Sequence, residues 1–361
     1  MNEIRSLTAL RGVAALWVFG FHLWLLDHAS PAPAYDGTPA ATLFEHGWTG
    51  VDLFFILSGY VLATVHPTLA MADAPRFLVR RAFRLYPLHV ATTLALAFGV
   101  ALASAAGMEL SRDGRYGWGD LPASLLLVGT FFSEPNRWNS VTWSISVELV
   151  CYALLPAALP VLRRVPQRGL AVTAFGLATA AGVWIVTLDA PSHGLPAVVR
   201  GLLGFYLGCC VALASAGPDG EAGARFGRRA GTWALAAAGV LVAATAADLP
   251  GLVPSCTAIL VGAIAAERGV VARALNAAPL VWLGRVSFSV YLLHMPVLAV
   301  MERVLPPHKL PLPPLGGAVL RDAVTLAVVL TLSALAYRLV EEPGRRLPSR
   351  LGLLAPRPIP A

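Results

Sequence analysis

The chain has 361 residues, of which 57% are hydrophobic and only 13% are charged. Soluble domains carry about 25% charged residues, so this composition excludes an ordinary soluble domain and predicts a polytopic membrane protein. The formal net charge of +7 fits basic cytoplasmic loops, and no basic patch with interleaved aromatic residues indicates nucleic acid as a partner.

Ten apolar runs of bilayer length follow one another along the chain. They predict an all-α fold, a polytopic membrane helical bundle with about ten transmembrane helices. A further run, 121–132, has only 12 residues and suits a short re-entrant or interfacial helix better than a crossing. We predict one transmembrane domain over 1–346 and a short Pro-rich cytoplasmic tail over 347–361. The ten runs are 9–28, 50–68, 86–106, 141–162, 169–188, 196–215, 232–249, 251–267, 286–304 and 319–340.

Basic residues between the runs indicate the topology. With the N-terminus inside, the segment 69–85 and its four arginines lie inside as well. The basic segments after residue 162 also lie inside, provided that 121–132 does not cross. Because cytoplasmic segments collect Arg and Lys, we predict a multi-pass protein of the inner (cytoplasmic) membrane with both termini in the cytoplasm.

Several ionisable residues fall inside the apolar runs. Arg11 and His22 share the first run, where a rise of 1.5 Å per residue separates them by about 16 Å, roughly half a bilayer core. His294 reaches a similar depth in another run, and Glu148 lies inside the run 141–162. A charge or imidazole at such depth is costly unless it pairs or lines a polar cavity, so these residues are functional candidates. Packing or structural pairing is the alternative for each.

Arginines at four-residue spacing indicate a second kind of site. Arg76, Arg80 and Arg84 form one stripe on a helix, with Arg81 beside it. Forked guanidinium groups suit phosphates, so the stripe predicts a site for a phosphate-rich ligand on the inner surface. Ordinary cytoplasmic charge resting on anionic lipid headgroups is the alternative.

The remaining composition predicts neither a metal site nor a soluble catalytic domain. The four cysteines lie in apolar stretches and lack metal-ligand spacing. The chain ends soon after its last apolar run, so any chemistry is expected in or at the membrane.

Six short motifs occur in order along nearly the whole chain. Together they resemble the acyltransferase-3 family of integral-membrane acyltransferases, which includes bacterial O-antigen and exopolysaccharide O-acetylases. The motifs are Arg11-x10-His22, the stretch Gly50–Gly59, Arg81-x-x-Arg84-Leu-Tyr-Pro87, Trp143-Ser-Ile-Ser-Val-Glu148, Ser287-Phe-Ser-Val-Tyr291-Leu-Leu-His294 and Glu342-Pro343.

The resemblance implies acyl transfer from acyl-CoA, most often acetyl-CoA, to a hydroxyl that is usually on a sugar. Arg11 and His22 match the arginine and histidine of the family's first span, and Arg81 and Arg84 match its R-x-x-R pair. The common continuation Val-Glu-Glu-Gln-Phe-Tyr is here Val-Glu-Leu-Val-Cys-Tyr, so only Glu148 can be carried over. Many relatives also end in a periplasmic esterase-like domain, which we do not expect here.

Acyl transfer to an alcohol needs a base, and neutral histidine suits that task because its pKa lies near 6.5. We predict that His22 deprotonates the acceptor hydroxyl while Glu148 or Asp52 orients it. Arg11 would stabilise developing charge or hold the pantetheine end of CoA, and Arg76, Arg80, Arg81 and Arg84 would bind its phosphates. Candidates for substrate binding are His294, Arg200, Trp143 and Tyr291.

Other functions remain open from the sequence. A transporter or flippase of a glycan or lipid intermediate would also carry buried His, Glu and Arg, and Asp52 could simply cap the helix beside it. A non-catalytic scaffold of an export complex explains the apolar sequence but not the buried charges. A small natural product could replace the glycan as acceptor. The sequence does not decide between acetyl and longer acyl groups, between direct transfer and an acyl-enzyme, or among oligomeric states.

Overall fold

The computed structural model describes residues 3–28, 33–108, 114–132, 137–189, 191–215 and 227–353. Within these ranges the regular structure is helical and contains no strand. The helices that build the bundle are α1 (Arg5–His28), α2 (Pro39–Glu45), α3 (Gly50–Val65), α4 (Ala74–Ala105), α5 (Leu121–Leu125), α6 (Gly129–Phe132), α7 (Thr142–Leu162), α8 (Gln167–Thr187), α9 (Gly194–Ser215), α11 (Ala230–Ala246), α12 (Val253–Ile264), α13 (Gly269–Leu275), α14 (Ala278–Val304), α15 (Pro314–Ala336) and α16 (Glu342–Arg350).

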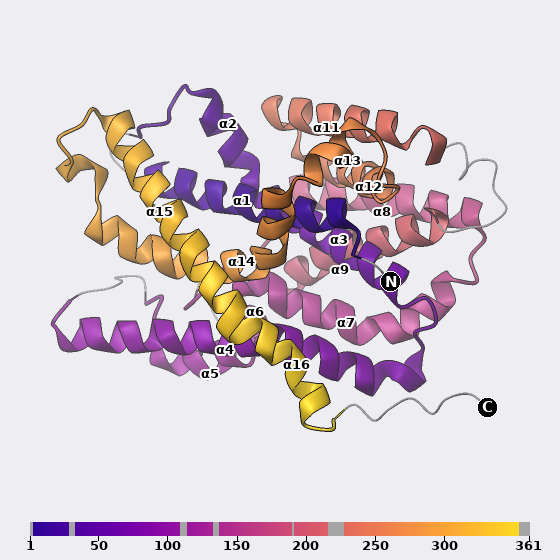
Figure 1. The fold of residues 1–361 in the computed structure, drawn as a ribbon, viewed down its shortest axis with the longest axis horizontal. Coiled ribbons are helices and arrows are strands. Elements are labelled where there is room, and N and C mark those ends of the chain that lie inside the picture. The colour runs from indigo at the N-terminus through magenta and orange to yellow at the C-terminus, as the bar shows by residue number, and fades with distance from the viewer. Residues whose placement is uncertain are drawn as a thin grey trace.

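The long helices run between two opposite faces of the molecule (Figure 1). We call the face where α1 begins, on the right of Figure 1, the N-terminal face. Hydrogen bonds tie its segments together: Ser6 at the start of α1 bonds Glu267 just after α12 at 2.6 Å, and Arg163 after α7 donates to the carbonyl of Leu69 after α3. The described ends of α3, α7 and α12 therefore lie at one end of the bundle.

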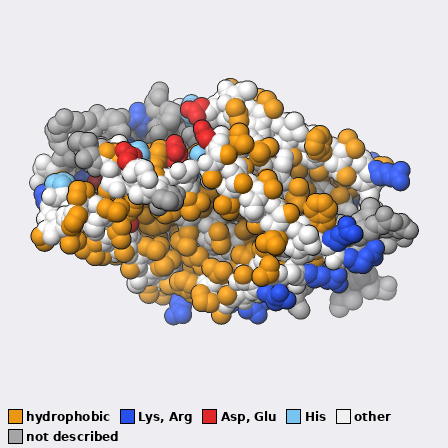
Figure 2. Space-filling view, turned by 90° about the horizontal axis from the view of Figure 1, so that it is seen from above, with side chains coloured by type: hydrophobic (Ala, Val, Ile, Leu, Met, Phe, Trp, Pro, Cys, Tyr) orange, Lys and Arg blue, Asp and Glu red, His pale blue; other side chains and the backbone are white. Residues whose placement is uncertain are grey.

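A broad hydrophobic surface separates the charged ends (Figure 2). Basic side chains gather towards the right of that view, whereas acidic ones lie towards the opposite end. Apolar side chains point outward between them; Phe175 on α8 is 75% exposed, and Phe98 on α4 is also exposed. Eight helices in the described residues are long and apolar enough to cross a membrane. A helical membrane bundle is thus confirmed.

The predicted count of about ten spans is not confirmed, because the runs 232–249 and 251–267 form shorter helices. The corresponding apolar helices are Ala230–Ala246 and Pro250–Ile264. They nevertheless connect the two faces as a hairpin. Its tip residue Asp248 lies 2.9 Å from His46, which precedes α3 on the opposite face.

The short run 121–132 turns back into the bundle as α5 and α6. His89, near the middle of α4, donates from Nε2 to the Ser124 carbonyl at 3.0 Å. Tyr86 donates to the Leu126 carbonyl, also at 3.0 Å. Five- and four-residue helices are too short to cross a bilayer. This segment therefore packs against α4 without forming a helix long enough to cross.

Close glycine packing sets α1 against α14. A Cβ on Gly284 would lie 1.8 Å from the Thr8 carbonyl oxygen, and one on Gly12 would lie 2.7 Å from the Gly284 nitrogen. Only glycine permits this approach. Both helices start at the N-terminal face, so equal distances along them reach equal depth. His22 follows Gly12 by ten residues, and His294 follows Gly284 by ten.

Candidate active site

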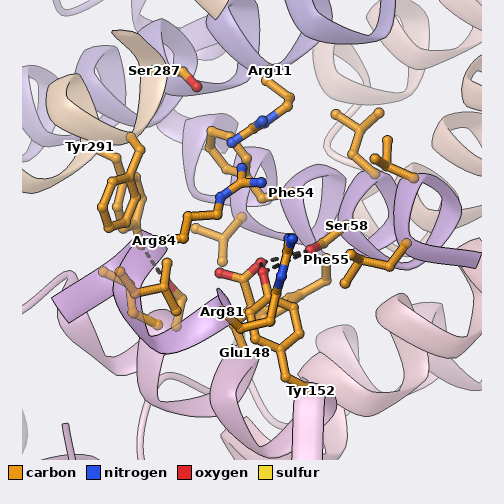
Figure 3. Close-up of a pocket in the computed structure, with 18 residues that line it drawn as sticks. Arg11, Phe54, Phe55, Ser58, Arg81, Arg84, Glu148, Tyr152, Ser287 and Tyr291 are labelled. Atoms are coloured by element: carbon orange, nitrogen blue, oxygen red, sulfur yellow. Dashed lines mark hydrogen bonds between the residues drawn. The ribbon is translucent and has the colours of Figure 1, made fainter. Parts of the chain in front are cut away.

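A cavity opens between α1, α3, α4, α7 and α14. Figure 3 shows Arg11, Arg81 and Arg84 turned into it, close to the Glu148 carboxylate. Three of the predicted site residues on separate helices, Arg11, Glu148 and Tyr291, therefore meet in one space with the arginine pair. Its lining residues are Arg11, Val51, Phe54, Phe55, Leu57, Ser58, Val61, Leu62, Arg81, Arg84, Leu85, Ser144, Ile145, Glu148, Tyr152, Ser287, Phe288 and Tyr291.

The cavity carries excess positive charge. Arg81 and Arg84 lie three residues apart on α4, which places them on one side of that helix. The Arg81 guanidinium lies 5.6 Å from the ring of Phe77, and its buried Nε has no hydrogen-bond partner among the described residues. Three guanidinium groups thus face one carboxylate. Such a cavity favours an anionic ligand.

Glu148 is held by two hydroxyl groups. Its Oε1 accepts a hydrogen bond from Ser58 of α3 at 2.7 Å and another from Tyr152, one turn further along α7. Arg11 and Arg81 also interact with it electrostatically. Glu148 therefore belongs to the arginine cavity, and no contact of the described residues brings it to His22.

His22 pairs with His294 instead of a carboxylate. The Nδ1 of His22 lies 3.3 Å from the Nε2 of His294, and the ring centroids are 4.9 Å apart. His294 is fully buried. The prediction that Glu148 or Asp52 orients His22 is therefore not supported by the geometry, which gives that position to His294.

The hydrogen bonds of the two rings define their tautomers. His22 Nδ1 lies 2.9 Å from the Val18 carbonyl oxygen, and His294 Nδ1 lies 3.2 Å from that of Val290. A carbonyl only accepts, so each Nδ1 carries the hydrogen. His294 Nε2 then offers a lone pair to His22 Nδ1–H, and His22 Nε2 keeps its own lone pair free. That lone pair can take a proton.

Tyr291 separates the arginine cavity from the histidine pair. It lines the cavity, and its ring centroid is 5.8 Å from those of both His294 and Phe54. Its hydroxyl bonds Ser144 at 2.7 Å. Neither histidine lines the cavity itself. A ligand extending from the arginines towards His22 therefore passes Tyr291 and Phe54.

Asp52 and Arg200 are paired with each other. Two hydrogen bonds of 2.8 and 2.6 Å join Arg200 on α9 to the Asp52 carboxylate on α3, and both side chains are buried. Trp48 and Trp143 flank the guanidinium at 5.1 and 5.4 Å. The predicted catalytic Asp52 and substrate-binding Arg200 and Trp143 thus form one contact between helices.

Replacing Asp52 with alanine is expected to destabilise the protein by about 3–5 kcal/mol, because it leaves the buried Arg200 without its counterion. Thermal unfolding in detergent measures this effect. Asp36→Ala is the control: Asp36 forms a partly exposed pair with His28, worth about 0–1 kcal/mol. Equal melting temperatures for both variants would show that the Asp52–Arg200 pair does not hold the fold.

The predicted arginine stripe divides in the structure. Arg84 lines the cavity together with Arg81, whereas Arg76 and Arg80 do not. Arg80 is exposed and Arg76 is half-buried. The four-residue spacing groups Arg84 with Arg76 and Arg80, whereas the cavity groups it with Arg81.

A second polar cluster closes the opposite face above the histidines. The Tyr35 hydroxyl donates to Asp322 at 2.5 Å, its backbone N–H bonds Asp27 of α1 at 3.1 Å, and Arg321 bonds Asp322 at 2.7 Å. Burial raises the pKa of the Tyr35 phenol, which keeps it a donor to the carboxylate. This cluster ties the segment after α1 to α15.

Sequence reasoning missed some cavity residues. Tyr152 and Ser58, which hold Glu148, and Ser287 were not among the predicted site residues. Each nevertheless lies in or directly after one of the six motifs. In the described part of the chain, no group of three or more His, Cys, Asp or Glu side chains is placed to hold a metal ion.

Comparisons with known proteins agree with this arrangement. A family model described as "Acyltransferase domain" matches residues 4–338. The acyltransferase MdmB of Streptomyces mycarofaciens is 30% identical, with 99% of this chain and 96% of that protein aligned. The peptidoglycan O-acetyltransferase OatA of Listeria monocytogenes is 24% identical over 95% of this chain and 56% of its own length. No solved structure matches the chain. The chain therefore belongs to the acyltransferase-3 family of membrane acyltransferases.

Proposed function

We propose that the protein is a membrane-embedded O-acyltransferase that moves an acyl group, chiefly acetyl, from acyl-CoA to a hydroxyl of a surface or lipid-linked glycan. The observation that carries the proposal is the cavity in which Arg11, Arg81 and Arg84 converge beside the His22–His294 pair. Acyl-CoA has a phosphate-rich end and a long uncharged arm ending in the thioester. The arginine end of the site matches the phosphates of acyl-CoA, and the histidine end matches the thioester.

The donor would lie along α1. Arg11 and His22 are about 16 Å apart along that helix, so one group cannot touch both. Arg11 therefore binds the phosphate end with Arg81 and Arg84, rather than the thioester oxygen. The extended pantetheine arm passes Tyr291 and Phe54 and brings the thioester to His22.

The proton transfer follows from the tautomers. The free Nε2 of His22 takes the proton of the acceptor hydroxyl as that oxygen forms a bond to the thioester carbonyl carbon. The carbon–sulfur bond then breaks, and the CoA thiolate leaves and receives the proton from His22. While His22 is an imidazolium, Val18 and His294 accept its Nδ1–H and stabilise the charge.

The N-terminal face is the cytoplasmic one in this proposal, in a cell inner membrane with both termini inside. CoA is a cytoplasmic donor. Helix α4 begins at this face, and its arginines lie in its first turns. Basic side chains gather at the same end of the molecule (Figure 2). The glycan hydroxyl would then approach His22 from the opposite face.

An assay with purified protein tests the function. Protein in liposomes is given acetyl-CoA labelled in the acetyl group together with a membrane-anchored glycan. We expect the label to appear in the glycan as an alkali-labile ester. Movement of the glycan across the bilayer without any covalent label would instead identify a carrier and overturn the proposal.

A further inference from the structure

A fourth arginine, Arg345, lies near the three arginines of the cavity. It lies on α16, close to the C-terminal end of the described chain and far in sequence from the other three. It interacts electrostatically with Arg84, Arg11 and Arg81. Its side chain is 34% exposed. Arg345 is therefore close to the cavity arginines and partly open to solvent, although it does not itself line the cavity.

The sequence around Arg345 fixes its position. A π-helical turn, Tyr337–Glu341, joins α15 to α16. It buries the Glu341 carboxylate, which accepts a hydrogen bond from Ser289 of α14 at 2.6 Å and another from Arg345. The Tyr337 ring centroid is 5.9 Å from the Arg345 guanidinium. The Glu341 carboxylate, itself fixed by Ser289, and the Tyr337 ring thus hold this arginine.

Close packing brings α16 onto α4, which it crosses in Figure 1. A Cβ on Gly344 would lie 2.7 Å from the Cβ and Cγ atoms of Pro87, so only glycine fits there. Pro87 is three residues after Arg84 and lies on the same side of α4. The residue after Gly344 is consequently placed beside Arg84.

The neighbouring arginine shows that this placement is specific. Arg346 also forms a pair with an acid four residues earlier, Glu342, but its side chain is 63% exposed. The Arg345 side chain, by contrast, is 34% exposed and interacts with the arginines of the cavity. Arg345 and Arg346 both pair with an acid four residues earlier, but Arg345 is turned towards the protein and Arg346 towards the solvent.

We propose that Arg345 is a fourth phosphate-binding residue of the donor site, which binds the nucleotide end of acyl-CoA at the mouth of the cavity. Like charges at close range repel, so four clustered arginines and one cavity carboxylate are stabilised by a polyanion. Glu341 and Ser289 orient the guanidinium, which keeps further N–H donors for a phosphate. This inference rests on the proposed function. It adds Arg345 to the donor site as a residue that favours donors with phosphate groups over donors without them.

Donor binding to the detergent-solubilised full-length protein tests the inference. Acetyl-CoA and S-acetylpantetheine, which has no phosphate, are compared as ligands of wild type, Arg345→Ala, Arg345→Lys and Arg346→Ala. We expect Arg345→Ala to weaken acetyl-CoA binding about tenfold and to leave S-acetylpantetheine unchanged. Arg345→Lys retains the charge opposite Glu341 and should recover part of the loss. Arg346→Ala should match wild type for both ligands.

Two results would overturn the inference. One is an Arg345→Ala variant that binds acetyl-CoA as tightly as Arg346→Ala. The other is an equal loss for both ligands, which would indicate a structural role for the Glu341–Arg345 pair. A wild-type protein that binds the two ligands equally would overturn the proposed CoA donor as well, so the wild-type comparison tells the two failures apart.

Discussion

Replacing His22 with glutamine is expected to lower the rate of acyl transfer about 10²–10⁴-fold, the usual contribution of a general base. Glutamine keeps a polar side chain of similar reach, but its amide cannot take the acceptor proton. Binding of acyl-CoA should be nearly unchanged, because the arginine end of the cavity is about 16 Å away along α1. Steady-state transfer and equilibrium binding with the same purified protein measure both quantities.

His28 supplies a matched control on the same helix. Its Nδ1 bonds the Trp24 carbonyl at 3.0 Å, just as that of His22 bonds Val18. His28→Gln should therefore retain activity. At His294, glutamine should retain more activity than alanine, because its amide oxygen can still accept the Nδ1–H of His22. Near-normal turnover in His22→Gln would show that His22 is a packing residue.

Replacing Arg81 and Arg84 together with alanine is expected to weaken acyl-CoA binding at least 100-fold. Each hydrogen bond between charged groups is worth about 1.5–3 kcal/mol, or roughly 10- to 100-fold in affinity. The loss should shrink at high salt, because exposed phosphate contacts are screened. Calorimetry or a competition assay with labelled CoA at two salt concentrations checks both statements.

Arg76 and Arg80 are the controls for this pair. Both precede the cavity arginines on α4, but neither lines the cavity. Their double alanine variant should bind acyl-CoA like wild type. Equal losses in the two double variants would indicate that the helix attracts anionic lipid or ligand only through its general charge.

The arrangement of the helices was largely predictable from the sequence, because a bilayer fixes the length and polarity of what crosses it. All ten apolar runs correspond to helices in the structure. The predicted count of about ten spans is not confirmed at the two runs around Asp248, because their helices are shorter than the eight that are long enough to cross a membrane. Hydropathy describes each segment by itself and does not include the packing of neighbouring helices that stabilises a short helix.

The partners of the buried polar residues were harder to predict. Sequence gives depth along a helix but not the direction in which a side chain points. Asp52 and Arg200 lie in two separate apolar runs, and predicting their pairing requires knowing that α3 and α9 are adjacent. The pairing of His22 with His294 was easier to predict than that of Asp52 with Arg200. Each histidine follows a close-packed glycine, Gly12 or Gly284, by ten residues, so two parallel helices in contact at these glycines bring the histidines to the same depth.

The arginines illustrate the same limit on α4. Arg80 and Arg81 differ by about 100° around the helix axis, and packing alone decides which of them meets the cavity. The R-x-x-R resemblance singled out Arg81 and Arg84, which line the same cavity. Arg345 had no comparable signal except the Glu-Pro motif just before it.

Alkylation by bromoacetyl-CoA tests most directly whether the donor lies with its phosphates at the arginines and its acyl group at His22. The reagent carries an electrophilic carbon in place of the acetyl methyl, and an imidazole lone pair displaces its bromide. The account predicts a single adduct on His22, located by mass spectrometry of the digested protein. Excess CoA should block it, and the Arg81/Arg84 double alanine variant should suppress it, unlike the Arg76/Arg80 variant. An adduct on Glu148 or Cys151, or one on His22 that CoA does not block, would contradict the proposed donor orientation.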